Sequence, residues 1–115
     1  MTLYAALIYS ADVDWSAPEH AEAMAEYGEF GQADASVIRG GAALYPTSTA
    51  TTVRTVGGKG GDVVTTDGPY TETKEVLTGF YLLECADLDE AVATAARIPA
   101  AWHGAVEVRP VIPMG

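Results

Sequence analysis

Two short apolar runs constrain the fold of this chain more than any other feature of its sequence. Leu3–Tyr9 reads LYAALIY, and Thr78–Cys85 reads TGFYLLEC. Both runs are short and consist of residues that suit a strand, and neither alternates regularly between apolar and polar side chains. Such runs are typical of strands that are buried on both faces. The sheet that they form must therefore be covered on both sides.

Two amphipathic helices are predicted to cover one of those sides. The first begins at a capping box formed by Ser16 and Glu19, with Pro18 in its first turn. An apolar stripe then follows at helical spacing: Met24, Tyr27, Gly31, Ala35 and Ile38. The second helix is shorter, has Asp87 as its N-cap and stops at Pro99.

The remaining segments complete the order of elements. RGGAALYP starts a second strand, Thr49–Val56 and DVVTTD form a hairpin around the turn GGKGG, and AVEVRPV is the last strand. The order indicates an α+β fold, a single domain over residues 1–115 with a ferredoxin-like βαββαβ core and an inserted β-hairpin. Helices on one face leave an apolar second face open, so we expect a homodimer that is formed through the sheet.

Charge and composition exclude several classes of partner. The net charge of -10, from 16 acidic and 6 basic residues, disfavours binding to nucleic acid or to an anionic membrane. No stretch approaches the roughly 20 apolar residues of a membrane span, and the N-terminus lacks the basic region of a signal peptide. The single cysteine, Cys85, allows no internal disulfide and is expected in the core. A cytoplasmic location is therefore expected.

The segment TTDGPYTETKE, residues 65–75, is the strongest candidate for a site. Asp67 precedes Gly68-Pro69, which is the pattern of a turn in which the aspartate accepts hydrogen bonds from the backbone. Glu72, Lys74 and Glu75 have two interpretations. They are either a solvated charged loop or a polar rim, where a lysine beside acids separates their pKa values for acid–base work.

Other single residues also have two interpretations each. His20 is either a partly buried, satisfied histidine or an acid–base group. Arg109 follows Glu107 by two residues, so it forms an ion pair on an edge strand or binds an anion, and Arg54 has the same two interpretations. Two histidines without Cys or carboxylate at ligand spacing make no metal site, and no nucleotide-binding motif occurs, so no metal and no cofactor are expected.

The stretch TDGPYTETKEVLTGFYLLECADLDEAVATAARIPA, with the closing VEVRPV, resembles the YCII-related family in its DGPF subgroup. Tyr70 stands where phenylalanine is commoner. The resemblance implies a dimeric α+β barrel with an enzymatic or ligand-binding role, and members encoded beside or fused to extracytoplasmic-function sigma factors. It also implies a His–Asp pair. His20 is the histidine of the first helix, but RIPAAWHG after the second helix has no aspartate, so that aspartate is missing or is replaced by Asp67.

These observations combine into one functional prediction with an alternative. The protein binds a small anionic or aromatic metabolite in a dimer-associated cleft. Its pocket lies between the sheet and the helices and is lined by aromatic residues such as Tyr4, Tyr9, Phe80 and Tyr81. If it is an enzyme, it performs metal-free acid–base chemistry of the isomerase or lyase type. The predicted catalytic residues are Asp67, His20 and Lys74, and the predicted substrate-binding residues are Glu72, Glu75, Arg109 and Tyr70. The alternatives are an accessory protein that contacts a sigma factor, or a motif that only builds the fold and the dimer.

Overall fold

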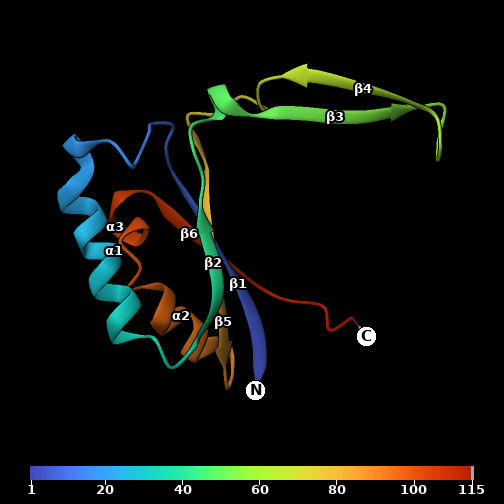
Figure 1. The fold of residues 1–115 in the computed structure, drawn as a ribbon. Coiled ribbons are helices and arrows are strands. Elements are labelled where there is room, and N and C mark those ends of the chain that lie inside the picture. Colours follow the sequence, from blue (N-terminus) through green and yellow to red (C-terminus); the bar gives the residue numbers. More distant parts are fainter. Residues whose placement is uncertain (115) are drawn as a thin grey trace.

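The computed structural model describes residues 1–114 and shows a central antiparallel sheet with helices on one side (Figure 1). The strand order is β2-β5-β1-β6, with β1 at Thr2–Ala11, β2 at Ile38–Ala43, β5 at Glu75–Cys85 and β6 at Ala105–Pro110. The helices are α1 (Ala21–Ala33), α2 (Leu88–Ala95) and α3 (Ala100–His103). This order confirms the ferredoxin-like βαββαβ fold. In the described part of the chain, no helix combines the length and the apolar composition needed to cross a membrane.

The alternation of side chains along β1 divides the sheet into two faces. Tyr4, Ala6, Ile8 and Ser10 are buried on the helix side, whereas the residues between them are only partly covered. On the helix side, Leu83, Cys85 and Ile98 are completely buried, and the rings of Phe30 and Tyr81 pack edge to face with centroids 5.1 Å apart. The core of the domain therefore lies between the sheet and the helices.

The first helix differs from the sequence prediction at both ends. The capping box does not form, because the backbone and the hydroxyl of Ser16 both donate to the Asp14 carboxylate. A short 3₁₀ helix, Pro18–His20, precedes α1. The helix ends at Ala33, and the backbone N–H of Asp34 makes the last hydrogen bond, to the carbonyl of Phe30. Ile38, which the predicted helical stripe included, lies in β2 instead. The chain has to turn here to return along the sheet.

The second helical region confirms one predicted cap and adds an element. Asp87 caps α2 by accepting a hydrogen bond from the backbone of Glu90 at 2.9 Å. The helix α2 ends at Ala95, four residues before the predicted end at Pro99. Pro99 directly precedes α3, where its fixed φ suits the start of a helix. His103, which the sequence placed in a loop, is the last residue of α3 and contacts Glu26 of α1 at 3.0 Å.

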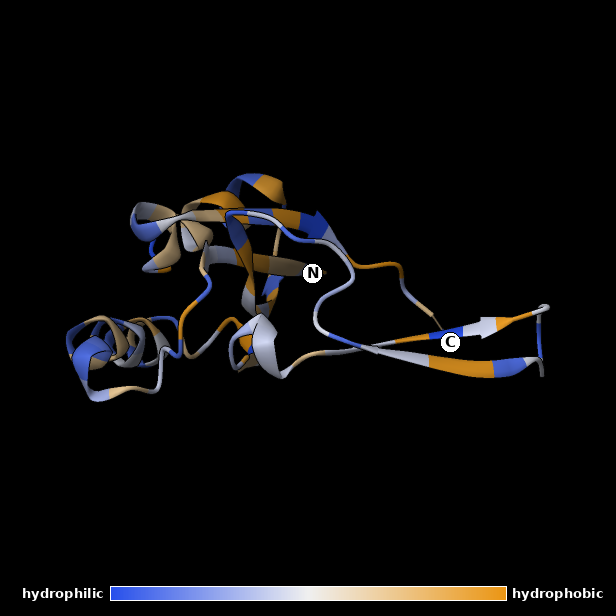
Figure 2. Cartoon of the chain, turned by 90° about the horizontal axis from the view of Figure 1, so that it is seen from above, coloured by the Kyte–Doolittle hydropathy of each residue, from blue (hydrophilic) through white to orange (hydrophobic). Residues whose placement is uncertain are grey.

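The inserted hairpin is confirmed and projects from the sheet. The strands β3 (Thr51–Val56) and β4 (Asp62–Asp67) pair only with each other, and we call residues 51–67 the arm. Figure 1 shows the arm on the side of the sheet away from the helices, and Figure 2 shows apolar segments on both of its strands. The radius of gyration is 16.2 Å, whereas a compact chain of this length would have about 13 Å. The arm therefore extends well beyond the body of the domain.

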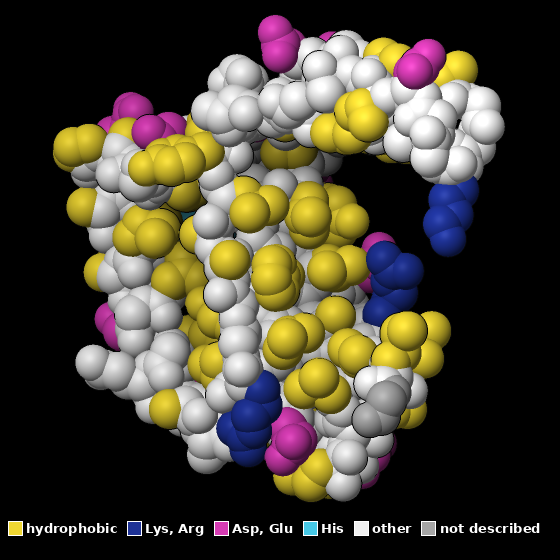
Figure 3. Space-filling view, turned by 45° about the vertical axis from the view of Figure 1, so that its right-hand side comes forward, with side chains coloured by type: hydrophobic (Ala, Val, Ile, Leu, Met, Phe, Trp, Pro, Cys, Tyr) yellow, Lys and Arg dark blue, Asp and Glu magenta, His cyan; other side chains and the backbone are white. Residues whose placement is uncertain are grey.

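The side of the sheet away from the helices is apolar and uncovered. We call it the open face. Its side chains follow from the strand register: Leu3, Ala5, Leu7, Tyr9, Leu77, Phe80 and Leu82. Figure 3 shows these apolar side chains gathered below the overhanging arm, with charged residues at the edges. The edge charges are paired, Arg39 with Glu84 at 3.4 Å and Arg109 with Glu107 at 2.7 Å.

Candidate functional site

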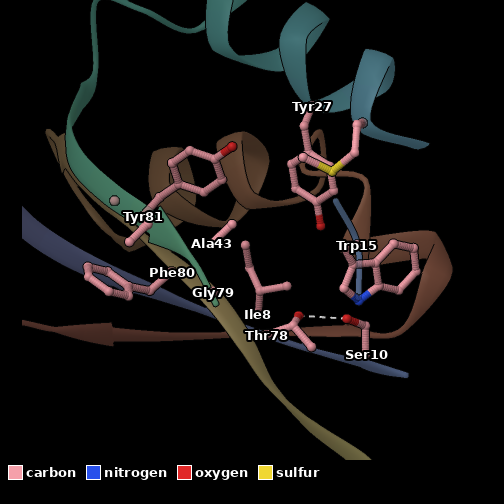
Figure 4. A pocket seen from close by; sticks show the side chains of 12 residues that line it. Ile8, Ser10, Trp15, Tyr27, Ala43, Thr78, Gly79, Phe80 and Tyr81 are labelled. Carbon is pink, nitrogen blue, oxygen red and sulfur yellow. Dashed lines mark hydrogen bonds between the residues drawn. The ribbon is translucent and has the colours of Figure 1, made fainter. Parts of the chain in front are cut away.

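A cavity of about 260 Å³ lies between the sheet and α1, and we call it the aromatic cavity (Figure 4). Its walls come from β1, β2, β5, α1 and the loop after β1. The larger lining side chains are apolar or aromatic: Ile8, Trp15, Met24, Tyr27 and Tyr81. Figure 4 shows Trp15 and Tyr27 on one side of the space and Tyr81 on the other. The cavity can therefore hold a small molecule between aromatic rings.

One wall of the aromatic cavity is polar. The hydroxyls of Ser10 and Thr78 are hydrogen-bonded to each other at 2.6 Å. They meet because of a β-bulge, where Ile8 pairs with Gly79 but Tyr9 already pairs with Leu77. Thr78 is the extra residue of β5 and turns its side chain to the same face as Ser10. The bulge thus places two hydroxyls at the end of an otherwise apolar space.

The lining carries no formal charge at neutral pH. Burial, and after it the neighbouring Tyr81, raises the pKa of Tyr27 to about 12, so its phenol stays protonated. Burial also raises the pKa of Tyr81. The other lining side chains are hydroxylic, aliphatic or aromatic. The site therefore suits an uncharged ligand, because an unpaired charge is costly to bury.

Two glycines keep β2 close to β5 beside this cavity. A Cβ at Gly41 would lie 2.5 Å from the carbonyl oxygen of Phe80, and a Cβ at Gly79 would lie 2.7 Å from that of Ala42. Neither position accepts a larger residue without moving the backbone. With Ala42 and Ala43 beside them, they form a wall of small side chains that leaves the space open.

A second cavity, of about 450 Å³, lies at the base of the arm, and we call it the polar cavity. Its lining includes Asp12, Thr47, Ser48, Glu72 and Thr73. The polar cavity adjoins the aromatic cavity at one pair of residues. Val76 of β5 lines the polar cavity, and its partner across the sheet, Ser10 of β1, lines the aromatic cavity. The two cavities therefore lie at the same end of β1 and β5.

The DGP motif closes the base of the arm. The backbone N–H of Gly68 donates to the carbonyl of Ala50 at 2.8 Å, and the hydroxyl of Thr52 donates to the carbonyl of Gly68 at 2.9 Å. Gly68 has a φ of 103°, a left-handed conformation that favours glycine. Among residues 1–114, no side-chain hydrogen bond involves Asp67. The turn therefore depends on Gly68, and the predicted capping by the aspartate is not seen.

The predicted catalytic residues lie on separate elements. His20 ends the 3₁₀ helix and packs at a tilt against Trp15 with ring centroids 4.8 Å apart, so it adjoins the aromatic cavity without lining it. Asp67 is the exposed last residue of β4, and Lys74 is exposed just before β5. In the described part of the chain, no hydrogen bond or ion pair joins any two of the three. Acid–base catalysis by these residues stays a prediction.

The predicted substrate-binding residues are also dispersed. Glu72 lines the polar cavity, Glu75 begins β5, and Tyr70 is 72% exposed with the guanidinium of Arg54 lying 5.0 Å from its ring centroid. Arg109 forms the edge-strand ion pair with Glu107. None of the four lines the aromatic cavity. Substrate binding by these four residues stays a prediction.

The predicted aromatic lining is correct for one side chain of four. The ring of Tyr81 faces the aromatic cavity. Phe80 borders the cavity, but the strand register places its side chain on the open face, as it does for Tyr9, and Tyr4 is part of the core. The sequence analysis missed Trp15, Ser10 and Thr78. A polar residue at the end of each apolar run was the available signal for Ser10 and Thr78, but only the bulge brings them together.

A pH-dependent contact is expected at the polar cavity. The backbone N–H of Thr47 donates to Asp12 at 2.8 Å, and the Thr47 hydroxyl donates to the same carboxylate. The hydroxyl, and after it the backbone, lowers the pKa of Asp12 below its ordinary 3.8. The contact should therefore be complete above pH 3.8 and be lost as the pH falls below that value. The chemical shift of the Thr47 amide proton, followed by NMR during acidification, measures it.

The control for this titration is Thr47→Val. It removes the hydroxyl but keeps the backbone donor, so the midpoint of the Asp12 titration should move up towards the ordinary value. An unchanged midpoint in the variant would show that the hydroxyl does not stabilise the carboxylate.

Comparisons with known proteins agree with this fold. The model of the YCII-related domain matches residues 2–115. An uncharacterized protein of Rhizobium meliloti (strain 1021) is 38% identical over 116 residues, which cover 95% of this chain and 91% of that protein. The family match spans the sheet, the helices and the arm alike. The chain therefore belongs to the YCII-related domain family.

Proposed function

We propose that this protein binds a small, neutral aromatic molecule in the aromatic cavity. The observation that carries the proposal is an uncharged space with a hydroxyl pair on one wall. The rings of Trp15, Tyr27 and Tyr81 face this space, and flat aromatic surfaces stack or meet edge to face at low conformational cost (Figure 4). The sequence predicted an anionic or aromatic ligand, and the lining supports the aromatic one.

The size of the cavity limits the ligand to one or two rings. Its volume is about 260 Å³, whereas an apolar cavity of about 150 Å³ already holds benzene in another protein. Drug-sized ligands occupy pockets of about 300–1,000 Å³. A substituted single ring or a small fused ring therefore fits within it.

The hydroxyl pair sets the polar requirement of the ligand. Ser10 and Thr78 share one hydrogen bond, so one hydroxyl proton remains available to donate, and oxygen lone pairs remain to accept. A phenol or a carbonyl group can use them. A carboxylate meets no Lys or Arg in the lining, so its desolvation would be uncompensated.

Binding is the role that this lining supports, because it contains no group that titrates near neutral pH. His20 contacts the cavity only through Trp15. The acid–base prediction and the sigma-factor alternative stay predictions that ligand identification would address.

A direct test compares two probes of similar shape and different charge. Fluorine NMR would follow para-fluorophenol and para-fluorobenzoate during titration with the protein. We expect the phenol to bind with an exchange-broadened or shifted signal and the benzoate to bind at least tenfold more weakly, which corresponds to about 1.4 kcal/mol. Stronger binding of the benzoate would contradict the neutral-ligand proposal.

A filled cavity provides the matched variant. Ala43→Phe places a ring in the space between Tyr27 and Tyr81 and should abolish binding of the phenol. Ala35→Phe makes the same change at an exposed turn and should leave binding unchanged. Equal binding by both variants would locate the probe elsewhere, for example on the open face, and the proposal would fail.

A further inference from the structure

We propose that the ligand of the aromatic cavity is an aromatic aldehyde or ketone. Its carbonyl oxygen accepts two hydrogen bonds, one from the hydroxyl of Tyr27 and one from the hydroxyl pair of Ser10 and Thr78. This assignment rests on the function proposed above, because an aromatic ligand first has to enter the cavity. It goes further by naming the functional group of the ligand and a third residue that selects it.

Three side-chain hydroxyls lie around one end of the aromatic cavity. Ser10 and Thr78 contribute two of them from the sheet, hydrogen-bonded to each other at 2.6 Å. Figure 4 shows that Tyr27 of α1 directs the third hydroxyl towards the end of the cavity where this pair lies. All three residues line the same space of about 260 Å³. One small molecule can therefore reach the polar groups of the helix and those of the sheet.

Two hydroxyl protons are left for a ligand. The bond between Ser10 and Thr78 uses one of the two protons of the pair, and the other remains available. Among residues 1–114, the Tyr27 hydroxyl donates to no partner. Burial raises the pKa of Tyr27 to about 12, so its proton is retained at neutral pH. The backbone of Ala100 lowers this pKa by acting on the phenol oxygen as a donor, which leaves the phenol proton unused.

A carbonyl oxygen is the neutral group that uses both protons. It has two lone pairs and no proton of its own, so it can accept from Tyr27 on one side and from the hydroxyl pair on the other. A phenol has to donate its own proton to one of these hydroxyls, which leaves a proton of the cavity without an acceptor. An unpaired donor in a buried space is unfavourable. The cavity should therefore prefer a carbonyl group to a phenol on the same ring.

The second tyrosine of the cavity provides an internal control. Tyr81 also lines the space, and burial raises the pKa of its phenol as well. Figure 4 shows its hydroxyl turned away from Ser10 and Thr78. The rings of Tyr27 and Tyr81 both face the ligand, but only the hydroxyl of Tyr27 is directed at the polar end. Removing each hydroxyl in turn therefore separates hydrogen bonding to the ligand from contact with the ring.

Fluorine NMR titrations with three probes on one ring test the proposal. Para-fluoroacetophenone offers only an acceptor, para-fluorophenol a donor and an acceptor, and para-fluorotoluene neither. We expect the acetophenone to bind most tightly and the toluene most weakly. Tyr27→Phe and Thr78→Val should each weaken binding of the acetophenone about fivefold, the usual effect of one hydrogen bond. Tyr81→Phe should leave it unchanged, and Tyr27→Phe should leave binding of the toluene unchanged.

The infrared spectrum of the bound probe gives a readout that a purely structural role of Tyr27 would not move. Hydrogen bonds to a carbonyl oxygen lower its stretching frequency, which can be followed in acetophenone labelled with ¹³C at the carbonyl. The frequency in the wild-type complex should be lower than in the Tyr27→Phe complex and equal to that in the Tyr81→Phe complex. Equal frequencies in all three complexes would show that Tyr27 does not donate to the ligand.

The outcomes distinguish this proposal from the function on which it rests. If none of the three probes binds, or if Ala43→Phe does not reduce their binding, the aromatic-ligand function fails and the carbonyl assignment fails with it. If the probes bind in the cavity but the acetophenone has no advantage over the phenol, only the carbonyl assignment is overturned. Equal weakening of acetophenone binding by Tyr27→Phe and Tyr81→Phe would also overturn that assignment alone.

Discussion

Replacing Leu83 by alanine is expected to lower the free energy of unfolding by about 2–5 kcal/mol, the usual range for a buried leucine. Leu83 is completely buried and belongs to the core cluster that also contains Cys85, Ile98 and Ala91. The substitution removes buried apolar atoms and leaves a cavity, because packed neighbours on the sheet and on α2 relax only in part. Urea denaturation followed by circular dichroism measures the change.

The neighbouring residue is a matched control that also tests the two faces of the sheet. Leu82 lies on the open face, where it is only partly covered in a single chain. At low protein concentration, Leu82→Ala should therefore cost much less than Leu83→Ala. Its cost should grow with concentration if a second copy covers the open face, because association stabilises the folded state by mass action. Equal costs at low concentration would contradict this assignment of the faces.

Replacing Asp34 by alanine should lower the free energy of unfolding by about 1–3 kcal/mol, the range for a lost hydrogen-bonded charge. Asp34 is 8% exposed and accepts three hydrogen bonds from Arg97, at 2.6, 3.1 and 3.2 Å. These bonds raise the pKa of Arg97 and join the end of α1 to the segment that follows α2. The cost stays below that of a fully buried pair because the Arg97 side chain is 53% exposed and keeps contact with water.

A second Arg–carboxylate pair provides the control. Glu84 contacts Arg39 at 3.4 Å, with side chains 40% and 43% exposed. Exposed pairs of this kind contribute about 0–1 kcal/mol. Glu84→Ala should therefore change stability little at low protein concentration. If Asp34→Ala costs no more than Glu84→Ala, the contact between the two helices does not stabilise the fold.

The sequence predicted the architecture well because local signals agreed with one another. Short apolar runs, amphipathic spacing, the Asp87 cap and the GGKGG turn each indicated their element within a few residues. The failures were at places where two local signals compete. Ser16 carried a capping pattern, but the nearer Asp14 accepts its hydrogen bonds. Pro99 marked the end of one helix and equally suits the start of α3.

The candidate site was predictable only in part, because it depends on contacts between distant strands. The charged motif after Asp67 is conspicuous along the chain, yet the structure spreads its residues over the arm, the polar cavity and the start of β5. The aromatic cavity uses side chains that are individually ordinary. Ser10 and Thr78 are 68 positions apart and meet only because a bulge shifts the register of β1 against β5.

The sequence by itself determined the class of fold, the presence of the arm and the apolar character of the second face of the sheet. These features follow from periodicity and composition, which act over a few residues and need no knowledge of the partner segment. Only the tertiary structure decided which side chains share a cavity. Membership of a cavity depends on the strand register, on a single extra residue at Thr78 and on the close approach that Gly41 and Gly79 permit. A shift of one residue in the strand register moves a side chain to the opposite face of the sheet.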